Sequence, residues 1–405
     1  MKTLSKWLQI SFFNLLLVAI LGLILRYKIA FYLPIIDQKN VLHSHSHFAF
    51  SGWISQTLML LLVYYLSKQL GANILNTYRW ILNANLITAY GMMFAFFIQG
   101  YAFFSITFST LSIVVSIWFA IFFWRDLSLV KVKSVSHLWF KWALIFSVIS
   151  ALGPFSLAYL MTSAQADQNV YLSSVYYYLH FQYNGWFFFA GMGLLTDQLP
   201  ADRCSSKKLY NAFYLFCAAC IPAYFLSILW SPVADKIYFL LILAVLAQLI
   251  GWVLVLVVIT KNSELLQTRF PKAGRVLLIL SAIAFTIKLI LQSGSIHPQL
   301  SQLSYGFRPI IIGYLHLVLL GVTTIFIIGY IISLNLIVLS RKVIVGVSIF
   351  VTGVIVNELL LMVQGVGALT YTIIPQVQIL LFGAALILVV GLGILFAGSL
   401  ERRAE

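Results

Sequence analysis

The chain has 405 residues, of which 62% are apolar or aromatic and 9% are charged, against about 25% charged residues in an average soluble domain. A soluble fold of this length needs far more polar surface, so the composition excludes a cytosolic globular enzyme, a disordered chain and a nucleic-acid-binding module. The net charge of +15 would suit a nucleic-acid partner, but its distribution along the chain predicts a membrane protein instead.

Apolar runs of about 18–25 residues, the length that crosses a bilayer core, follow one another along the chain. The first run follows Lys2 and Lys6 and has the pattern of an anchor rather than of a removable signal. The connections are short and no internal repeat is apparent, so residues 1–405 are expected to form a single all-α transmembrane domain, a polytopic helical bundle. The twelve predicted spans are residues 8–30, 45–67, 79–101, 105–124, 139–161, 171–195, 209–230, 236–260, 273–292, 308–334, 343–365 and 373–399.

Lysine and arginine predict the orientation of these spans, because they gather in cytoplasmic loops. With both termini and the loops after every second span assigned to one side, that side holds 19 of the 25 basic residues. Both termini are therefore expected to be cytoplasmic. The positive charge marks topology and attraction to the inner leaflet rather than a nucleic-acid surface. We expect a multi-pass protein of a bacterial cytoplasmic membrane, with the lipid bilayer as a partner.

Six of the seven histidines are predicted to lie in the outer half of the membrane. Three enter with the second span, two lie eight or nine residues inside the sixth and tenth spans, and one lies in the outer loop before the tenth. The six are His43, His45, His47, His180, His297 and His316.

Other polar side chains share this outer layer. Ionisable groups in a bilayer are costly, face a protein interior and mark function by default. The layer therefore indicates a buried polar cofactor, a metal or an ion pathway. Its further members are Arg26, Gln99, Gln182, Asn184, Lys288, Gln292, Asn357, Glu358 and Gln364.

Imidazoles in an apolar helical setting are ligands for haem or for transition metals. A haem held between two helices needs one inward-pointing histidine from each. His43 and His47 are four residues apart and share a helix face, whereas His45 points roughly the other way. His316 lies near Gly321, and small residues beside a ligand let a flat macrocycle approach the backbone.

Arg26 and Arg308 are predicted at the outer ends of spans 1 and 10, where they suit charge-assisted bonds to haem propionates. For each histidine, a purely structural or solvated role is an alternative to the role of a ligand. A single intramembrane histidine is as often a structural hydrogen-bonding group, the three-histidine tract can be merely solvated, and His297 has the features of a loop residue. The haem hypothesis therefore depends on joint placement rather than on any one residue.

The stretch His43-Ser-His-Ser-His-Phe-Ala-Phe-Ser-Gly-Trp53, with Leu25-Arg26 and Pro34 before it, resembles the start of helix 2 in subunit I of the haem–copper oxidase superfamily. The cbb3-type and nitric-oxide-reductase branches belong to that superfamily. The resemblance implies a twelve-helix bundle, both termini inside, and haem in the outer part of the membrane.

The same resemblance assigns residues. A helix 2 histidine would ligate a low-spin haem, with His47 favoured over His43. His316 matches the haem ligand of helix 10, and His180 falls where helix 6 supplies a copper ligand.

Three departures put a binuclear centre in doubt. Residues 209–235 contain no histidine where the family has a copper-binding pair. Tyr314 stands where a second helix 10 histidine is expected, and Asn184 follows His180 where some branches have a cross-linked tyrosine. A single bis-histidine haem would survive, Tyr314 would be an alternative axial ligand, and a reduced second site for copper or another metal would use His180 with His45 or His297.

The resulting hypothesis is a haem-binding membrane protein that acts in electron transfer, or in chemistry or sensing of O₂ or NO, with a cytochrome or quinol as electron donor. Whether it is an oxidoreductase stays open.

Two alternatives need no haem. The first is a metal or proton transporter whose path is lined by Glu358, Lys288, His180 and Gln248. The second is a copper-handling assembly factor that uses the histidine tract.

Overall fold

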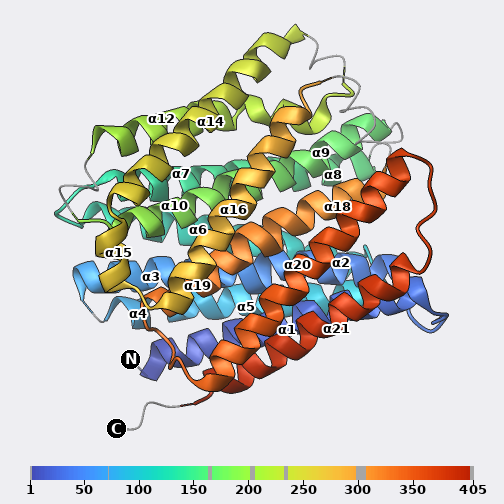
Figure 1. Cartoon of the computed structure of the whole chain (residues 1–405), viewed down its shortest axis with the longest axis horizontal. Coiled ribbons are helices and arrows are strands. Elements are labelled where there is room, and N and C mark those ends of the chain that lie inside the picture. The colour runs from blue at the N-terminus through green and yellow to red at the C-terminus, as the bar shows by residue number, and fades with distance from the viewer. Residues whose placement is uncertain are drawn as a thin grey trace. The chain divides into compact units, whose positions relative to one another are not determined.

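The computed structural model describes residues 2–71, 73–162, 167–200, 206–231, 236–297 and 307–401. Of these residues, 86% are helical and none is in a strand. Ten helices among them are long and apolar enough to cross a membrane, or eleven if a bent pair is one span (Figure 1). The expectation of an all-α, multi-pass membrane protein is thus confirmed.

Internal contacts divide the chain into two compact units. The first consists of Met1–Phe119, Phe270–Ser281 and Ile312–Glu405, and the second of Ala120–Arg269 and Ala282–Ile311. A single domain over the whole chain therefore stays a prediction.

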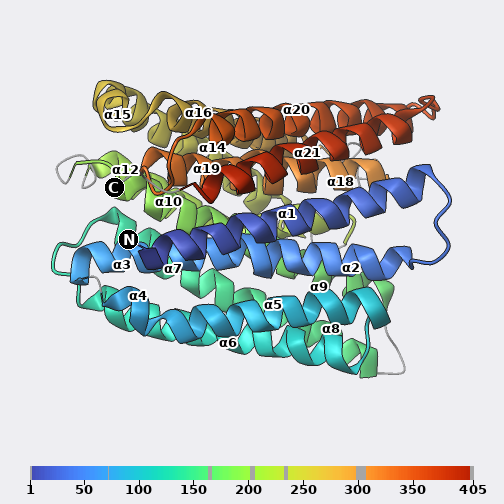
Figure 2. The same ribbon diagram turned by 90° about the horizontal axis from the view of Figure 1, so that it is seen from below.

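The first unit contains the long helices at both ends of the chain. Helix α1 packs on α2 and α21, α2 packs on α5, and α20 packs along α21; Figures 1 and 2 both show α20 and α21 side by side. Its helices are α1 (Lys2–Ala30), α2 (Gln38–Phe48), η1 (Ala49–Ser55), α3 (Gln56–Leu70), α4 (Ile74–Thr77), α5 (Arg79–Gln99), most of α6 (Phe103–Ser128), most of α18 (Arg308–His316), η4 (Leu317–Thr324), α19 (Ile325–Ser333), α20 (Arg341–Leu369) and α21 (Val377–Ser399).

The second unit is built around aromatic side chains. Trp139 is fully buried and contacts Phe188, Phe189 and Phe213, with ring centroids 4.9–5.9 Å away. Its helices are α7 (Val135–Ser150), α8 (Leu152–Thr162), α9 (Gln168–His180), η2 (Phe181–Phe187), α10 (Phe188–Asp197), α12 (Lys207–Cys220), η3 (Pro222–Ile228), α14 (Tyr238–Lys261), α15 (Ser263–Arg269) and most of α16 (Lys272–Gly294).

Two of the twelve predicted spans are not among the ten. The span predicted at 209–230 is α12 followed by η3, bent by 47°, because Pro222 has no N–H group and cannot continue an α-helix. The span predicted at 171–195 coincides with the run α9–η2–α10, whose tyrosines, amides and His180 make it the most polar of the predicted spans. The count of twelve and the orientation of the termini stay predictions.

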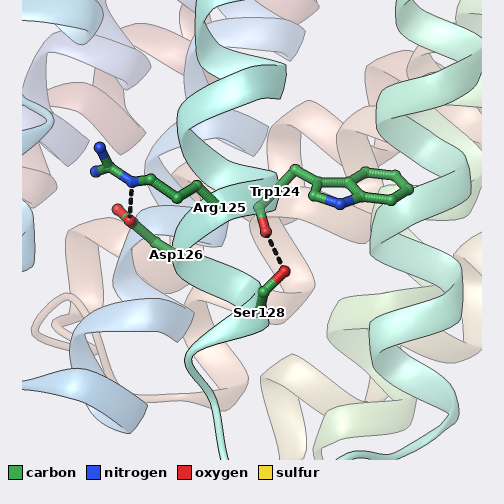
Figure 3. Close-up of polar contacts among 4 residues, drawn as sticks. All are labelled: Trp124, Arg125, Asp126 and Ser128. Carbon is green, nitrogen blue, oxygen red and sulfur yellow. Dashed lines mark hydrogen bonds and ion pairs between the residues drawn. The ribbon is translucent and has the colours of Figure 1, made fainter.

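Basic side chains gather near the end of α6, which is predicted to be cytoplasmic. Arg125 Nε donates to Asp126 Oδ1 at 2.8 Å, and the hydroxyl of Ser128 donates to the carbonyl of Trp124 at 2.8 Å (Figure 3). The Lys141 ammonium, on α7, lies 4.9 Å from the centroid of the Trp124 ring. This end of α6 is therefore a polar and aromatic collar, of the kind expected at a membrane–water interface.

Glycines set the distance between α20 and α21. A Cβ atom on Gly391 would lie 2.5 Å from the backbone nitrogen of Phe350, and one on Gly346 would collide with the backbone of Leu395. Membrane helices approach closely where small residues line the contact, since lipid supplies no hydrophobic force to hold them together.

Gly391→Val should separate α20 from α21, because the added side chain meets backbone that cannot move aside. We expect destabilisation of about 1–3 kcal/mol or more, measured as a lower thermal midpoint in detergent. Gly383→Ala, on the same helix with no atom within 4 Å of the new Cβ, is the matched control. Equal midpoints for the two variants would contradict this packing.

Candidate functional site

His45, on α2, points toward α1. Its Nδ1 lies 3.0 Å from the carbonyl oxygen of Val18, and a Cβ on Gly22 would lie 3.2 Å from its Cε1. Because a carbonyl only accepts, Nδ1 must carry the proton, and Nε2 keeps a free lone pair. Gly22 is thus one reason that α1 can come close to this ring.

His316, the last residue of α18, has the same protonation pattern. Its Nδ1 donates to the carbonyl of Ile312, one turn earlier, at 2.8 Å. Nε2 again keeps its lone pair. Metal-binding histidines typically donate their other N–H to a carbonyl or carboxylate in this way, which fixes the ring and its tautomer.

The two rings share one electrostatic neighbourhood in the first unit. His316 lies within electrostatic range of His45 and of Arg26, and Arg26 lies within the same range of His45 and of Glu358. Both rings are surrounded by protein and yet stay partly accessible. Their free nitrogens are therefore not sealed by packing.

The guanidinium of Arg26 is a cation near these two rings that has no bonding partner among the described residues. Within the described residues it makes no hydrogen bond and no ion pair, and the nearby Glu358 accepts a hydrogen bond from the Asn357 amide at 3.1 Å instead. A free guanidinium beside two ligand-type imidazoles suits an anionic group of a bound molecule, such as a carboxylate.

His43 and His47 lie on the other side of α2. The His47 ring stacks on Phe96 with centroids 4.3 Å apart, and its Nε2 lies 3.3 Å from the Tyr101 hydroxyl. The His43 ring meets Tyr101 edge-on at 4.6 Å. These two histidines face α5 and the residues after it, whereas the ring that faces α1 is His45.

Both ring nitrogens of His180 are occupied. Nε2 donates to the carbonyl of Cys220 at 2.8 Å, and Nδ1 accepts from the Asn184 amide at 3.1 Å. The Cys220 carbonyl is available because the Tyr224 N–H bonds to Ile221 within the 3₁₀ turn that follows Pro222. This geometry presents no lone pair to a metal, so a copper role for His180 stays a prediction without structural support.

The other predicted site residues are less informative. Tyr314 is half-buried on α18 in the first unit. His297, exposed after α16, and Arg308, exposed at the start of α18, belong to the second unit. Their predicted roles toward a haem or a second metal stay predictions.

No three His, Cys, Asp or Glu side chains converge as a metal site anywhere in the described part of the chain. A pair of imidazoles is the protein's whole share of ligands for a haem iron, because the porphyrin supplies the other four. The pair His45 and His316 fits that donor set and does not resemble a metal cage made of protein alone.

Three histidines, His47, His180 and His316, are each followed by a π-helix. η2 begins directly after His180, η4 directly after His316, and η1 two residues after His47. π-helical turns are rare and occur frequently at functional sites. Helical-wheel reasoning, which assumes 3.6 residues per turn, misses these segments.

A sequence signal for them does exist. His47, His180 and His316 are each followed five residues later by glycine, and the first two share the pattern His-Phe-x-x-x-Gly-Trp. One short helical pattern therefore recurs along the chain, while the absence of a larger internal repeat stays a prediction.

Buried side chains supply hydrogen bonds to the backbone of η1. The Asn14 amide donates to the carbonyl of Gly52 at 2.6 Å, and its oxygen accepts from the Tyr90 hydroxyl at 2.6 Å. The Asn85 amide donates to the carbonyl of Ser51 at 3.1 Å. The widened turn thus keeps its polar groups paired in an apolar interior.

One hydrogen bond joins η1 to η4. The Trp53 indole N–H donates to the Thr324 hydroxyl at 3.0 Å, and both side chains are 1% exposed. Since η1 follows α2 and η4 follows α18, this bond ties together the two helical runs that carry His45 and His316.

No protein-family model matches this chain, and no curated protein matches its sequence.

Asn14→Leu should weaken η1, because it leaves the Gly52 carbonyl and the Tyr90 hydroxyl without their partner. Buried polar groups left unpaired cost about 1–3 kcal/mol, and the thermal midpoint in detergent should fall accordingly. Ser11→Ala, one turn away on α1, is the control, because the Ser11 hydroxyl is buried without a partner among the described residues. An Asn14→Leu protein as stable as Ser11→Ala would contradict this role.

Proposed function

We propose that this chain is a haem-binding integral membrane protein that holds haem iron between His45 and His316. The observation that supports the proposal is that the two imidazoles have the same protonation pattern and the same kind of hydrogen bond. Each donates Nδ1–H to a backbone carbonyl, each keeps Nε2 free, and both lie beside Arg26.

The geometry favours a different residue of the histidine tract from the one that the sequence favoured. His47 was the preferred helix 2 ligand, followed by His43, but both rings pack against Phe96 and Tyr101. His45 is the histidine of α2 that interacts with His316. The proposal therefore keeps His316 and replaces His47 by His45.

Arg26 would pair with a haem propionate, in keeping with its free guanidinium. The bound haem would supply one-electron chemistry or a binding site for a small gas such as O₂ or NO. His45 and His316 together would hold the iron, and a haem held by two histidines would supply electron transfer. A cytochrome or a quinol would be the electron donor.

The resemblance to subunit I of the haem–copper oxidases is part of this proposal, reduced to its low-spin haem. A second metal centre has less support, because both nitrogens of His180 are hydrogen-bonded. The copper-handling alternative is weakened in turn, because His45 points away from the face that His43 and His47 share.

His45→Ala and His316→Ala should each abolish the low-spin haem spectrum, whereas His47→Ala should keep it. The protein would be expressed with haem supply, purified, and measured by visible absorption of its oxidised and reduced forms. Loss of an axial imidazole removes an iron bond, while loss of His47 removes only its contacts with Phe96 and Tyr101.

His297→Ala, at an exposed position, controls for the effect of removing an imidazole anywhere. A wild-type protein without a Soret band would refute the haem proposal altogether. A spectrum lost in His47→Ala but kept in His45→Ala would restore the ligand that the sequence favoured.

Arg26→Gln should lower the reduction potential of the bound haem, because a nearby cation favours the electron-rich reduced state. The expected change is on the order of tens of millivolts, from a charge interaction across a protein interior. Spectroelectrochemical titration measures it, with Lys28→Gln as control, since the Lys28 ammonium donates to the carbonyl of Leu33 instead. An unchanged potential in Arg26→Gln would place Arg26 away from the haem.

A further inference from the structure

Lys288 is a buried cation in the second unit that the haem proposal does not use. It lies on α16 and is 2% exposed. Its ammonium donates to the Gln292 side-chain oxygen at 2.5 Å, and the Gln292 amide donates to the Gln248 oxygen, on α14, at 2.8 Å. One of the three ammonium protons is thus accounted for.

No carboxylate balances this charge. Among the described residues, Lys288 forms no salt bridge, and the groups that interact with it electrostatically are the Cys220 thiol and His180 rather than a carboxylate. Its other close neighbour is the Phe285 ring, whose centroid lies 5.5 Å from the ammonium. A buried charge without a partner is costly, and proteins avoid it by pairing the charge or neutralising it.

A small cavity adjoins the ammonium, with room for about one water-sized particle. Two of the residues that line it carry unused donors: the Lys288 ammonium has two unused protons, and the Gln248 amide nitrogen makes no hydrogen bond among the described residues. The rest of the wall is Asn184, Cys220 and four phenylalanine rings. It contains no acidic side chain.

We propose that this cavity binds one small monovalent anion of the halide class, held by Lys288 and Gln248. A neutral water would accept hydrogen bonds from these donors but leave the ammonium charge uncompensated. An anion would accept the same hydrogen bonds and also balance the charge. The Asn184 side chain, which donates to His180, closes one wall of the cavity, so the helix that carries His180 would take part in the site. This site does not depend on haem binding.

Stability of the full-length protein in detergent tests the proposal, with bromide as the probe and sodium gluconate replacing it at constant ionic strength. A ligand that binds only the folded state raises the midpoint as its concentration rises above Kd. The wild-type midpoint should increase by a few degrees with bromide. Lys288→Met should lose this response, whereas Lys141→Met, in the same unit, should keep it.

Lys288→Met should fold, because an apolar side chain of similar length replaces an unpaired charge; Gln248→Leu is a second variant, expected to weaken the response. Anomalous diffraction from bromide-grown crystals would locate the ion independently, with a peak beside Lys288. A wild-type midpoint that is the same in bromide and gluconate would overturn the proposal. So would a bromide response that survives in Lys288→Met.

Discussion

The need to pair every backbone polar group inside an apolar bundle governs this structure. A π-turn displaces carbonyls from the regular helical ladder, and no water is at hand to accept or donate in their place. Asn14 and Asn85 meet that need at η1, and Trp53 joins η1 to Thr324 of η4. These buried contacts set the rotation of the helical runs whose histidines form the candidate site.

Site chemistry follows from this backbone arrangement more than from residue type. His45 and His316 become ligand-type imidazoles because the carbonyls of Val18 and Ile312 take their Nδ1 protons. His180 has the same side chain, yet it is a structural group because a carbonyl and an amide occupy both its nitrogens. These three histidines thus have two chemical states, assigned by neighbours one helical turn away (Ile312, Asn184) and by neighbours remote in sequence (Val18, Cys220).

The sequence predicts the helices well because run length and apolarity are local properties that a bilayer constrains directly. The sequence also predicts that the His45 and His47 side chains point to different sides of their helix, since alternate residues of a helix do not share a face. Which side meets α1 depends on tertiary packing at Gly22 and Phe96, which no local pattern encodes. The bend at Pro222 has an angle that only the structure supplies.

The proline at 222 has an effect well beyond its own turn. By diverting the Tyr224 N–H to Ile221, it leaves the Cys220 carbonyl free to take the His180 proton. The hydrogen bonding of His180 thus depends on a residue of another helix. A lineage that exchanged this proline for a helix former would return that carbonyl to its own helix and release an imidazole nitrogen.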